Sequence, residues 1–345
     1  MHNPADVSGA LSAMIKRTGV PALAAAAIHQ GKIVSVGSTG TRKKGEAARV
    51  THDDRFHIGS CTKSMTATLG AILIDKGRLR WETGVAEVFP RNEVNTAYRG
   101  ATFEHLVSNT AGAPGDIEPS LWTSLWERNG TKREQRRMLV REILRRPPAY
   151  EPGTDQVYSN AGFSIAGAML ETLMDKSYEQ LLSENLLDPL EMSSAGFRAP
   201  ASHGLIDQPY GHKESFFRIT PVDPEPHGDN PPAIAPAGAV HCSVMDFAKY
   251  AQFHLRRNQM LSEESWKRLH ESAAHRDYGH GWILVKRDWA HGTALTHSGS
   301  NTMFFSTIWI APERDFAAVS MCNLGGRKGL KKCDQAIHYL INKHL

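Results

Sequence analysis

The stretch GSCTKSMTATLGAIL (Gly59–Leu73) places a serine directly before an apolar run at helical spacing. Within it, Ser60 and Lys63 are three positions apart, and residues at that spacing share one face of a helix. A serine hydroxyl is a weak nucleophile at neutral pH and needs a neighbouring base or cation. The free N–H groups at the start of a helix favour an oxyanion there. The stretch therefore predicts a nucleophile, its activator and part of an oxyanion site.

An S-x-x-K tetrapeptide alone is weak evidence, because about one is expected by chance in a chain of this composition. A surface serine and lysine on an ordinary helix would explain it equally well. Two later triplets add to it. YSN at Tyr158–Asn160 is the single Y-x-N of the sequence, and HSG at His297–Gly299 follows it at the mouth of a strand pattern. The three motifs in this order are far more specific than any one of them.

The order S-x-x-K, Y-x-N, H-x-G resembles the serine β-lactamase and penicillin-binding-protein superfamily. Within it, the tyrosine motif resembles the class C branch: class C β-lactamases, DD-peptidases, and related esterases and D-amino-acid amidases. Two further segments resemble that family, Thr102–Gly115, with Asn109 where histidine is usual, and Pro236–Leu255. The resemblance implies an α+β fold of the β-lactamase/transpeptidase type. In that fold an antiparallel sheet is flanked by the N- and C-terminal helices and an α-rich subdomain is inserted.

Hydrophobic periodicity gives the same layout. Ala10–Arg17 predicts a helix, and Pro21–Gly40 predicts a hairpin that turns at Gln30-Gly31. Leu330–Ile341 predicts a C-terminal helix. Three late strands are predicted at Gly281–Arg287, Met303–Ile310 and Phe316–Met321, and His297 is expected on the edge strand of the sheet, facing the helix that begins at Ser60. We therefore expect one catalytic domain over residues 1–345, with an α/β subdomain at about 1–59 and 258–345 and an α-rich subdomain at about 60–257.

The resemblance assigns roles to individual residues. Ser60 is the acylated nucleophile, and Lys63 activates it either by taking its proton or as a cation. Tyr158 is a second basic group, whose pKa should fall beside the lysine cation. Asn160 would bond the lysine amine and the substrate amide; alternatively it is only a helix N-cap. The oxyanion hole would come from the backbone N–H groups of Ser60 and Ser300.

The third motif departs from the class C pattern. Class C β-lactamases carry lysine where His297 stands, and histidine is mostly neutral at pH 7. This shifts the expected substrates from β-lactams to esters, D-amino-acid amides or peptides. Ser298 and Gly299 would line the substrate strand, although Gly299 alone could be a β-bulge glycine. The alternatives are a true class C-type β-lactamase or DD-carboxypeptidase, and a non-catalytic binding or structural protein on the same fold. Intact Ser60, Lys63 and Tyr158 argue against the last.

Composition excludes several other classes. The net charge of +4 is too small to indicate nucleic-acid binding, and Lys132–Arg146 predicts an amphipathic helix with a solvated basic face. No apolar stretch of membrane-spanning length and no signal-peptide pattern occur, which suggests a cytoplasmic protein or a mature form whose signal was removed. There is no C-x-x-C, H-E-x-x-H or G-x-S-x-G, so we expect no metal, no cofactor and no α/β-hydrolase. The partner is a small-molecule or peptide substrate, and the oligomeric state stays open. Each cysteine is expected to be a buried small hydrophobe: Cys61, Cys242, Cys322 and Cys333.

Overall fold

Both ends of the chain contribute to one mixed sheet in the computed structural model, which describes residues 3–127, 129–216, 218–272 and 277–345. Within these residues the sheet has seven strands in the order β1-β3-β2-β12-β11-β10-β9. Neighbours run antiparallel, except for the parallel pair β1 and β3. In chain order the strands are β1 (Ala5–Asp6), β2 (Ala22–His29), β3 (Lys32–Gly40), β9 (Ile283–Arg287), β10 (Gly292–Ser300), β11 (Phe305–Ala311) and β12 (Phe316–Cys322).

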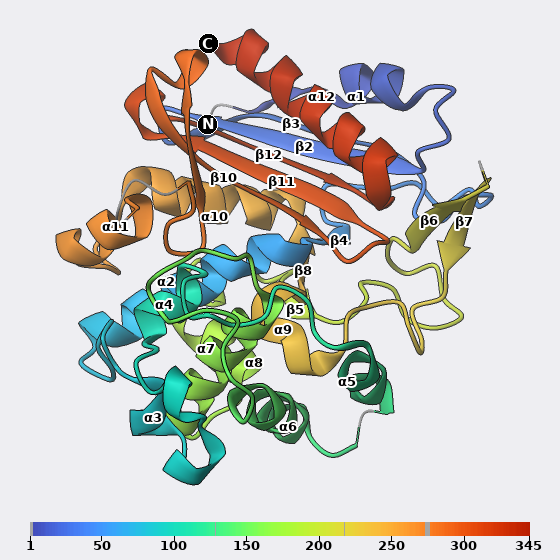
Figure 1. Ribbon diagram of the computed structural model, residues 1–345. Coiled ribbons are helices and arrows are strands. Elements are labelled where there is room, and N and C mark those ends of the chain that lie inside the picture. The colour runs from blue at the N-terminus through green and yellow to red at the C-terminus, as the bar shows by residue number, and fades with distance from the viewer. Residues whose placement is uncertain (1–2, 128, 217, 273–276) are drawn as a thin grey trace.

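Helices cover both faces of this sheet (Figure 1). On one face lie α1 (Ser8–Ile15) and α12 (Gly326–His344), and on the other α10 (Val244–Arg256) packs against β2 and β12. The alanine-rich strand β2 explains how both faces are buried. Because side chains alternate along a strand, Ala24 and Ala26 join one hydrophobic cluster while Ala25 and Ala27 join the other. The small side chains let helices approach closely from both sides.

The inserted part between the sheet strands is mainly helical (Figure 1). Its helices are α2 (Thr62–Asp75), α3 (Val85–Val88), α4 (Phe103–Val107), α5 (Pro119–Ser124), α6 (Lys132–Leu144), α7 (Asn160–Met174), α8 (Tyr178–Leu182) and α9 (Ala235–Gly238); α11 (Glu263–His270) follows α10. Two small sheets accompany them: β4 (Arg55–His57), β8 (Val240–Ser243) and β5 (Gly196–Phe197), and the hairpin β6 (Gly211–Ser215) and β7 (Arg218–Val222). Single turns occur at Gly59–Cys61, Arg91–Glu93, Thr96–Tyr98, Leu125–Glu127, Ser183–Leu187, Pro232–Ile234, Asp288–Ala290 and Pro312–Arg314.

The predicted elements are present with shifted ends. The hairpin turns at Gln30 and Gly31 as expected, and the terminal helices cover the sheet. The expectation that His297 lies on the sheet's edge strand was wrong, because β9 is the edge strand beyond β10. However, β9 pairs with β10 only from Gly292 to Thr296. The segment from His297 to Ser300 therefore lies past the end of β9.

The basic helix α6 is amphipathic as predicted, but its basic residues are not all solvated. Arg136 is completely buried, where it contacts the carboxylates of Glu171 and, at 2.9 Å, Glu179. A buried charge of this kind needs such partners, because losing its water is costly. The partners come from α7 and α8, far along the chain, so the helical pattern alone could not indicate them.

Each of the cysteines is buried and free, as expected. None of the helices in the described residues is both long and apolar enough to cross a membrane. The subdomain limits at residues 59 and 257 stay a prediction.

Buried histidines make the fold sensitive to acid. Burial lowers their pKa values from the ordinary 6.5 to about 4 for His212 and His241, to about 3 for His270 and His297, and well below 6.5 for His254. Below pH 6.5 the unfolded chain therefore binds more protons than the folded chain. The contribution of these neutral histidines to the free energy of unfolding is fully present above that pH. It is expected to fall as the pH drops toward their pKa values in the folded protein, by up to about 1.4 kcal/mol per pH unit for each group.

Unfolding free energies from urea titrations between about pH 8 and pH 4.5 check this expectation. The slope of unfolding free energy against pH measures how many more protons the unfolded chain binds. His270→Gln is expected to lower that number by up to about one, because glutamine can still face His254 but does not titrate. The matched control is His338→Gln, an exposed histidine on α12, which should keep the wild-type slope. An equal slope in wild type and His270→Gln would contradict the prediction.

Candidate active site

Ser60 lies in the turn η1 (Gly59–Cys61) that leads directly into α2. Its flanking backbone is held from two sides. On one side, the N–H of Ile58 donates to the carbonyl of Val240 at 2.9 Å, and the N–H of Val240 donates to the Thr62 hydroxyl at 3.2 Å. On the other side, the Ser306 hydroxyl of β11 donates to the Ile58 carbonyl at 2.8 Å. The serine is therefore fixed between β8 and the main sheet.

Two glycines let β10 approach the serine closely. Gly59 has a left-handed φ of +51°, and a Cβ there would lie 2.3 Å from the Ser300 nitrogen. A Cβ on Gly299 would lie 1.9 Å from the Ile58 carbonyl oxygen and 2.6 Å from the Ser60 nitrogen. Neither position has room for a side chain. The amide nitrogens of Ser60 and Ser300, the predicted oxyanion pair, are brought to the same place by this contact.

Lys63 connects the serine to the inserted subdomain. Its Nζ lies 3.2 Å from Ser60 Oγ, 2.7 Å from Asn160 Oδ1 and 2.8 Å from the Ala237 carbonyl oxygen. The residue is completely buried, and burial lowers the pKa of its amine well below the ordinary value. A neutral amine has two N–H groups and one lone pair. In this neutral form, Oδ1 of Asn160 and the carbonyl oxygen of Ala237, which can only accept, take both N–H groups, and the lone pair is left to face the serine hydroxyl.

Asn160 begins α7 but does not cap it. The cap is Ser159, whose hydroxyl accepts from the N–H of Gly162 at 3.0 Å. This leaves the Asn160 side chain free to face Lys63, which excludes the simpler reading of Asn160 as an N-cap. The preceding loop is held by Asn109, which has a left-handed φ of 61° and accepts from the N–H groups of Val157 and Ser159. Asparagine tolerates that conformation better than most residues.

Tyr158 lies over the lysine, and its hydroxyl bonds Ser60. The Lys63 nitrogen is 4.6 Å from the centre of its ring. The expected fall in the pKa of Tyr158 is not found. Although 43% of the surface of Tyr158 is exposed, desolvation of its phenol oxygen raises that pKa above its ordinary value, more than the hydrogen bond with Ser60 lowers it. The physical reason is that the phenolate would lose its contact with water, and the loss of this hydration outweighs the stabilisation by the Ser60 hydrogen bond.

His297 is almost wholly buried, with 2% of its surface exposed. Its Nδ1 donates to the Ser298 carbonyl at 2.8 Å, so its Nε2 accepts from the Tyr278 hydroxyl at 3.2 Å. Burial, reinforced by nearby Lys63, lowers the pKa of the ring to about 3. The third motif therefore presents a neutral group, as the sequence indicated. Ser298 itself is exposed and bonds the Thr307 hydroxyl at 3.2 Å.

A family model described as Beta-lactamase matches residues 7–340. The chain belongs to the beta-lactamase family. The resemblance inferred from the three motifs is thus confirmed, and the protein is a hydrolase of the serine beta-lactamase type. What the individual residues do stays a prediction.

Relatives of this beta-lactamase family protein include penicillin-binding protein 4 of Amycolatopsis lactamdurans, which is 27% identical over 333 residues, or 89% of this chain and 81% of that protein. Protein flp of Staphylococcus aureus strain MW2 is 23% identical over 90% of this chain, which spans only 61% of flp. Among solved structures, an octameric penicillin-binding protein homologue from Pyrococcus abyssi has a TM-score of 0.79 at 22% identity, over 98% of this chain and 79% of that one. A D-stereospecific amidohydrolase from Streptomyces sp. has a TM-score of 0.75 at 20% identity, over 95% and 96%. These structures confirm the β-lactamase/transpeptidase-like fold.

Sequence reasoning missed several groups at this beta-lactamase family site. The Ala237 carbonyl is backbone, so no residue type could indicate it. Tyr278 had a weak signal, because it begins the aromatic and glycine-rich run YGHGW. His57 and Asp229 touch each other at 2.7 Å behind the serine, and only the fold reveals that contact.

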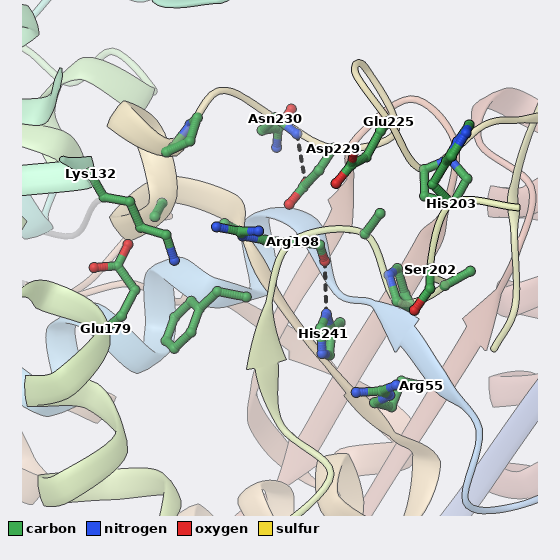
Figure 2. Close-up of a pocket in the computed structure, with 18 of the residues that line it drawn as sticks. Arg55, Lys132, Glu179, Arg198, Ser202, His203, Glu225, Asp229, Asn230 and His241 are labelled. Atoms are coloured by element: carbon green, nitrogen blue, oxygen red, sulfur yellow. Dashed lines mark hydrogen bonds between the residues drawn. The ribbon is translucent and has the colours of Figure 1, made fainter. Parts of the chain in front are cut away.

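A polar cavity of about 670 Å³ has Asp229, the contact partner of His57, in its wall (Figure 2). Charged side chains such as Lys132, Arg198 and Asp229 line it. Ser60 and Tyr158, both within the described residues, do not line it, so it is not the place of the candidate nucleophile. In the described part of the chain, no cluster of three or more His, Cys, Asp or Glu side chains is arranged to hold a metal ion.

Proposed function

We propose that this protein is a serine hydrolase that cleaves ester or amide bonds through an acyl-enzyme on Ser60. The observation that carries the proposal is the buried Lys63 amine, held by two acceptors with its third direction toward Ser60 Oγ at 3.2 Å. A base of lowered pKa beside a hydroxyl is the arrangement that activates a serine nucleophile.

In the acylation step, Lys63 takes the Ser60 proton while Oγ attacks the substrate carbonyl. The carbonyl oxygen becomes an oxyanion, and the backbone N–H groups of Ser60 and Ser300 stabilise it. The proton then moves from the lysine ammonium, by way of the Tyr158 hydroxyl, to the departing alcohol or amine. The bond to the leaving group breaks, and the acyl group stays on Ser60.

In the deacylation step, water replaces the leaving group. Lys63 is neutral again, so it can accept a proton from water through the Tyr158 hydroxyl, which gives one proton and receives another. The raised pKa of Tyr158 supports this relay role over that of a standing phenolate base. Attack of the water oxygen releases the acid and returns the proton to Ser60.

The substrates we propose carry no carboxylate next to the reacting bond. Histidine at 297 is neutral because burial holds its pKa at about 3, so it offers no charge to the carboxylate of a β-lactam. Short-chain esters and D-amino-acid amides do not need that charge. The similarity of fold to a D-stereospecific amidohydrolase from Streptomyces sp. makes amides of D configuration the first compounds to try.

We expect kcat/KM to be higher for p-nitrophenyl acetate or D-alanine p-nitroanilide than for nitrocefin. Steady-state assays of the purified protein on these compounds make the test. If nitrocefin is preferred by a wide margin, the protein is a β-lactamase and the proposed substrate class is wrong.

The charge argument has its own test in His297→Lys. A charge-assisted hydrogen bond contributes about 1.5–3 kcal/mol, so nitrocefin kcat/KM should rise by about 10- to 100-fold. His297→Gln, which remains uncharged, is the matched control and should bring no such gain. Equal nitrocefin rates in both variants would show that charge at this position does not set the substrate.

A further inference from the structure

A histidine directly behind the nucleophile takes no part in the steps above. His57 ends β4 and is completely buried. Its Nδ1 accepts a hydrogen bond from the N–H of Gly59 at 3.0 Å. Its Nε2 lies 2.7 Å from Oδ1 of Asp229, whose own surface is only 8% exposed. Among the described residues Nε2 makes no hydrogen bond, so its contact with Asp229 is a close one whose N–H is not aligned with the carboxylate oxygen.

These contacts determine where the proton of His57 lies. A backbone N–H can only donate, so Nδ1 must be the bare nitrogen. Nε2 therefore carries the proton and lies against the carboxylate, since two lone pairs at 2.7 Å would repel each other. His57 thus joins Asp229, by a close contact of opposite polarity, to the Gly59 amide, by a hydrogen bond.

The Gly59 amide is a sensitive point for the site. Gly59 adopts its left-handed φ of +51° against the backbone of β10, and the next N–H along the chain is that of Ser60. A bond that holds the Gly59 amide fixes the peptide plane before it, and through the glycine the direction of the Ser60 N–H and Oγ. A displacement near 1 Å in such a site can cost about 10²-fold in rate.

Asp229 brings this pair into contact with the loop that also supports the lysine. Figure 2 shows Asp229 beside Asn230 on the wall of the polar cavity. The Asn230 side chain donates to the Gly238 carbonyl at 2.7 Å, one residue after the Ala237 carbonyl that accepts from Lys63. One loop thus supports both the serine backbone and the lysine amine.

We propose that His57 and Asp229 are a positioning pair, which holds the Gly59 amide and thereby keeps the Ser60 N–H and hydroxyl in their reactive directions. Neither residue touches the substrate. The inference rests on the proposed function, because positioning has a kinetic effect only if Ser60 is the nucleophile.

The kinetic test compares variants at equal numbers of sites labelled by a fluorophosphonate, with p-nitrophenyl acetate as substrate. His57→Phe keeps an aromatic ring but loses the hydrogen bond with Gly59 and the polar contact with Asp229, and should lower kcat per labelled site by about 10²-fold with little change in KM. His57→Asn places an oxygen where Nδ1 was, so it should recover kcat to within about tenfold of wild type. Asp229→Ala should fall between them.

A matched control lies on the same loop. The exposed pair His203 and Asp223, 2.6 Å apart, contacts no backbone of the serine turn, so Asp223→Ala should keep the wild-type kcat. If His57→Phe has a lower melting temperature than the wild type but the same kcat per labelled site, the pair only stabilises the fold and the proposal is overturned.

A second measurement does not depend on activity. Nitrogen-15 NMR of the histidine rings should find the proton of His57 on Nε2, and the Gly59 amide should exchange slowly in wild type and faster in Asp229→Ala. A proton on Nδ1 of His57 would overturn the proposal that His57 and Asp229 are a positioning pair. If the wild type is neither labelled at Ser60 nor active on any ester or amide, the proposed function fails, while the NMR result still reports on the pair itself.

Discussion

Replacing Ser60 with alanine is expected to reduce ester or amide turnover by about 10⁶-fold while the protein stays folded. The hydroxyl is the only part removed, and the turn that holds it is fixed by backbone bonds to β8 and by the Ser306 hydroxyl. The measurement is kcat on the best substrate, together with circular dichroism and the melting temperature. Full activity in a folded variant would exclude Ser60 as the nucleophile.

Labelling by a fluorophosphonate provides the control for this result. Intact-mass spectrometry should find one adduct on the wild type and none on Ser60→Ala. The neighbouring Cys61 is the obvious competing nucleophile, but burial raises the pKa of its thiol to about 12 and keeps it protonated. Cys61→Ala should therefore still be labelled, and loss of the adduct in that variant alone would point to the thiol.

Lys63→Met is expected to slow acylation by about 10²–10⁴-fold, the range that general-base assistance provides. Methionine keeps the length of the side chain but supplies neither the lone pair toward Ser60 nor the bonds to Asn160 and the Ala237 carbonyl. Stopped-flow measurement of the p-nitrophenol burst separates acylation from turnover. A wild-type burst rate would show that another group takes the serine proton.

Tyr158→Phe is the informative comparison to Lys63→Met. If Tyr158 is a relay and Lys63 the base, the phenylalanine variant should still acylate but should deacylate slowly, so that the acyl-enzyme accumulates and is seen by mass spectrometry. If both variants lose the burst equally, the two residues act as one unit in acylation and the division of roles proposed above is wrong.

The pairing of Ser60 with Lys63 could be predicted from sequence because it is local, at one helical turn. Asn160 and Tyr158 could be brought to the same place only through the resemblance to a family, since their contacts with Lys63 cross about a hundred residues of chain. The strands of the sheet were predicted from alternating side-chain polarity, and the terminal helices from hydrophobic residues at helical spacing. Both patterns are contained in short stretches of sequence, so the ends of the predicted elements differ from those in the structure by only a few residues.

Other features depended on packing that no short stretch encodes. The direction of the Tyr158 pKa was predicted wrongly because it depends mainly on desolvation of the phenol by surrounding elements, which the sequence does not show. Arg136 on the basic helix was wrongly expected to be exposed to solvent, because its burial depends on the packing of other elements against that helix. The place of β10 inside the sheet depended on β9, a strand whose pairing covers only part of its neighbour.

The contact of Gly59 with Gly299 has a consequence for how the protein is made. These residues are separated by 240 positions, so the ribosome delivers the proposed nucleophile Ser60 and its proposed base Lys63 long before the strand that completes their surroundings. A nascent chain that ends before Ser300 lacks the second amide for the oxyanion. Contacts of such long sequence separation also form late and slowly in folding. If Ser60 and Ser300 act as proposed, hydrolytic activity arises only after Ser300 has been synthesised, and a product that terminates before Ser300 is inert.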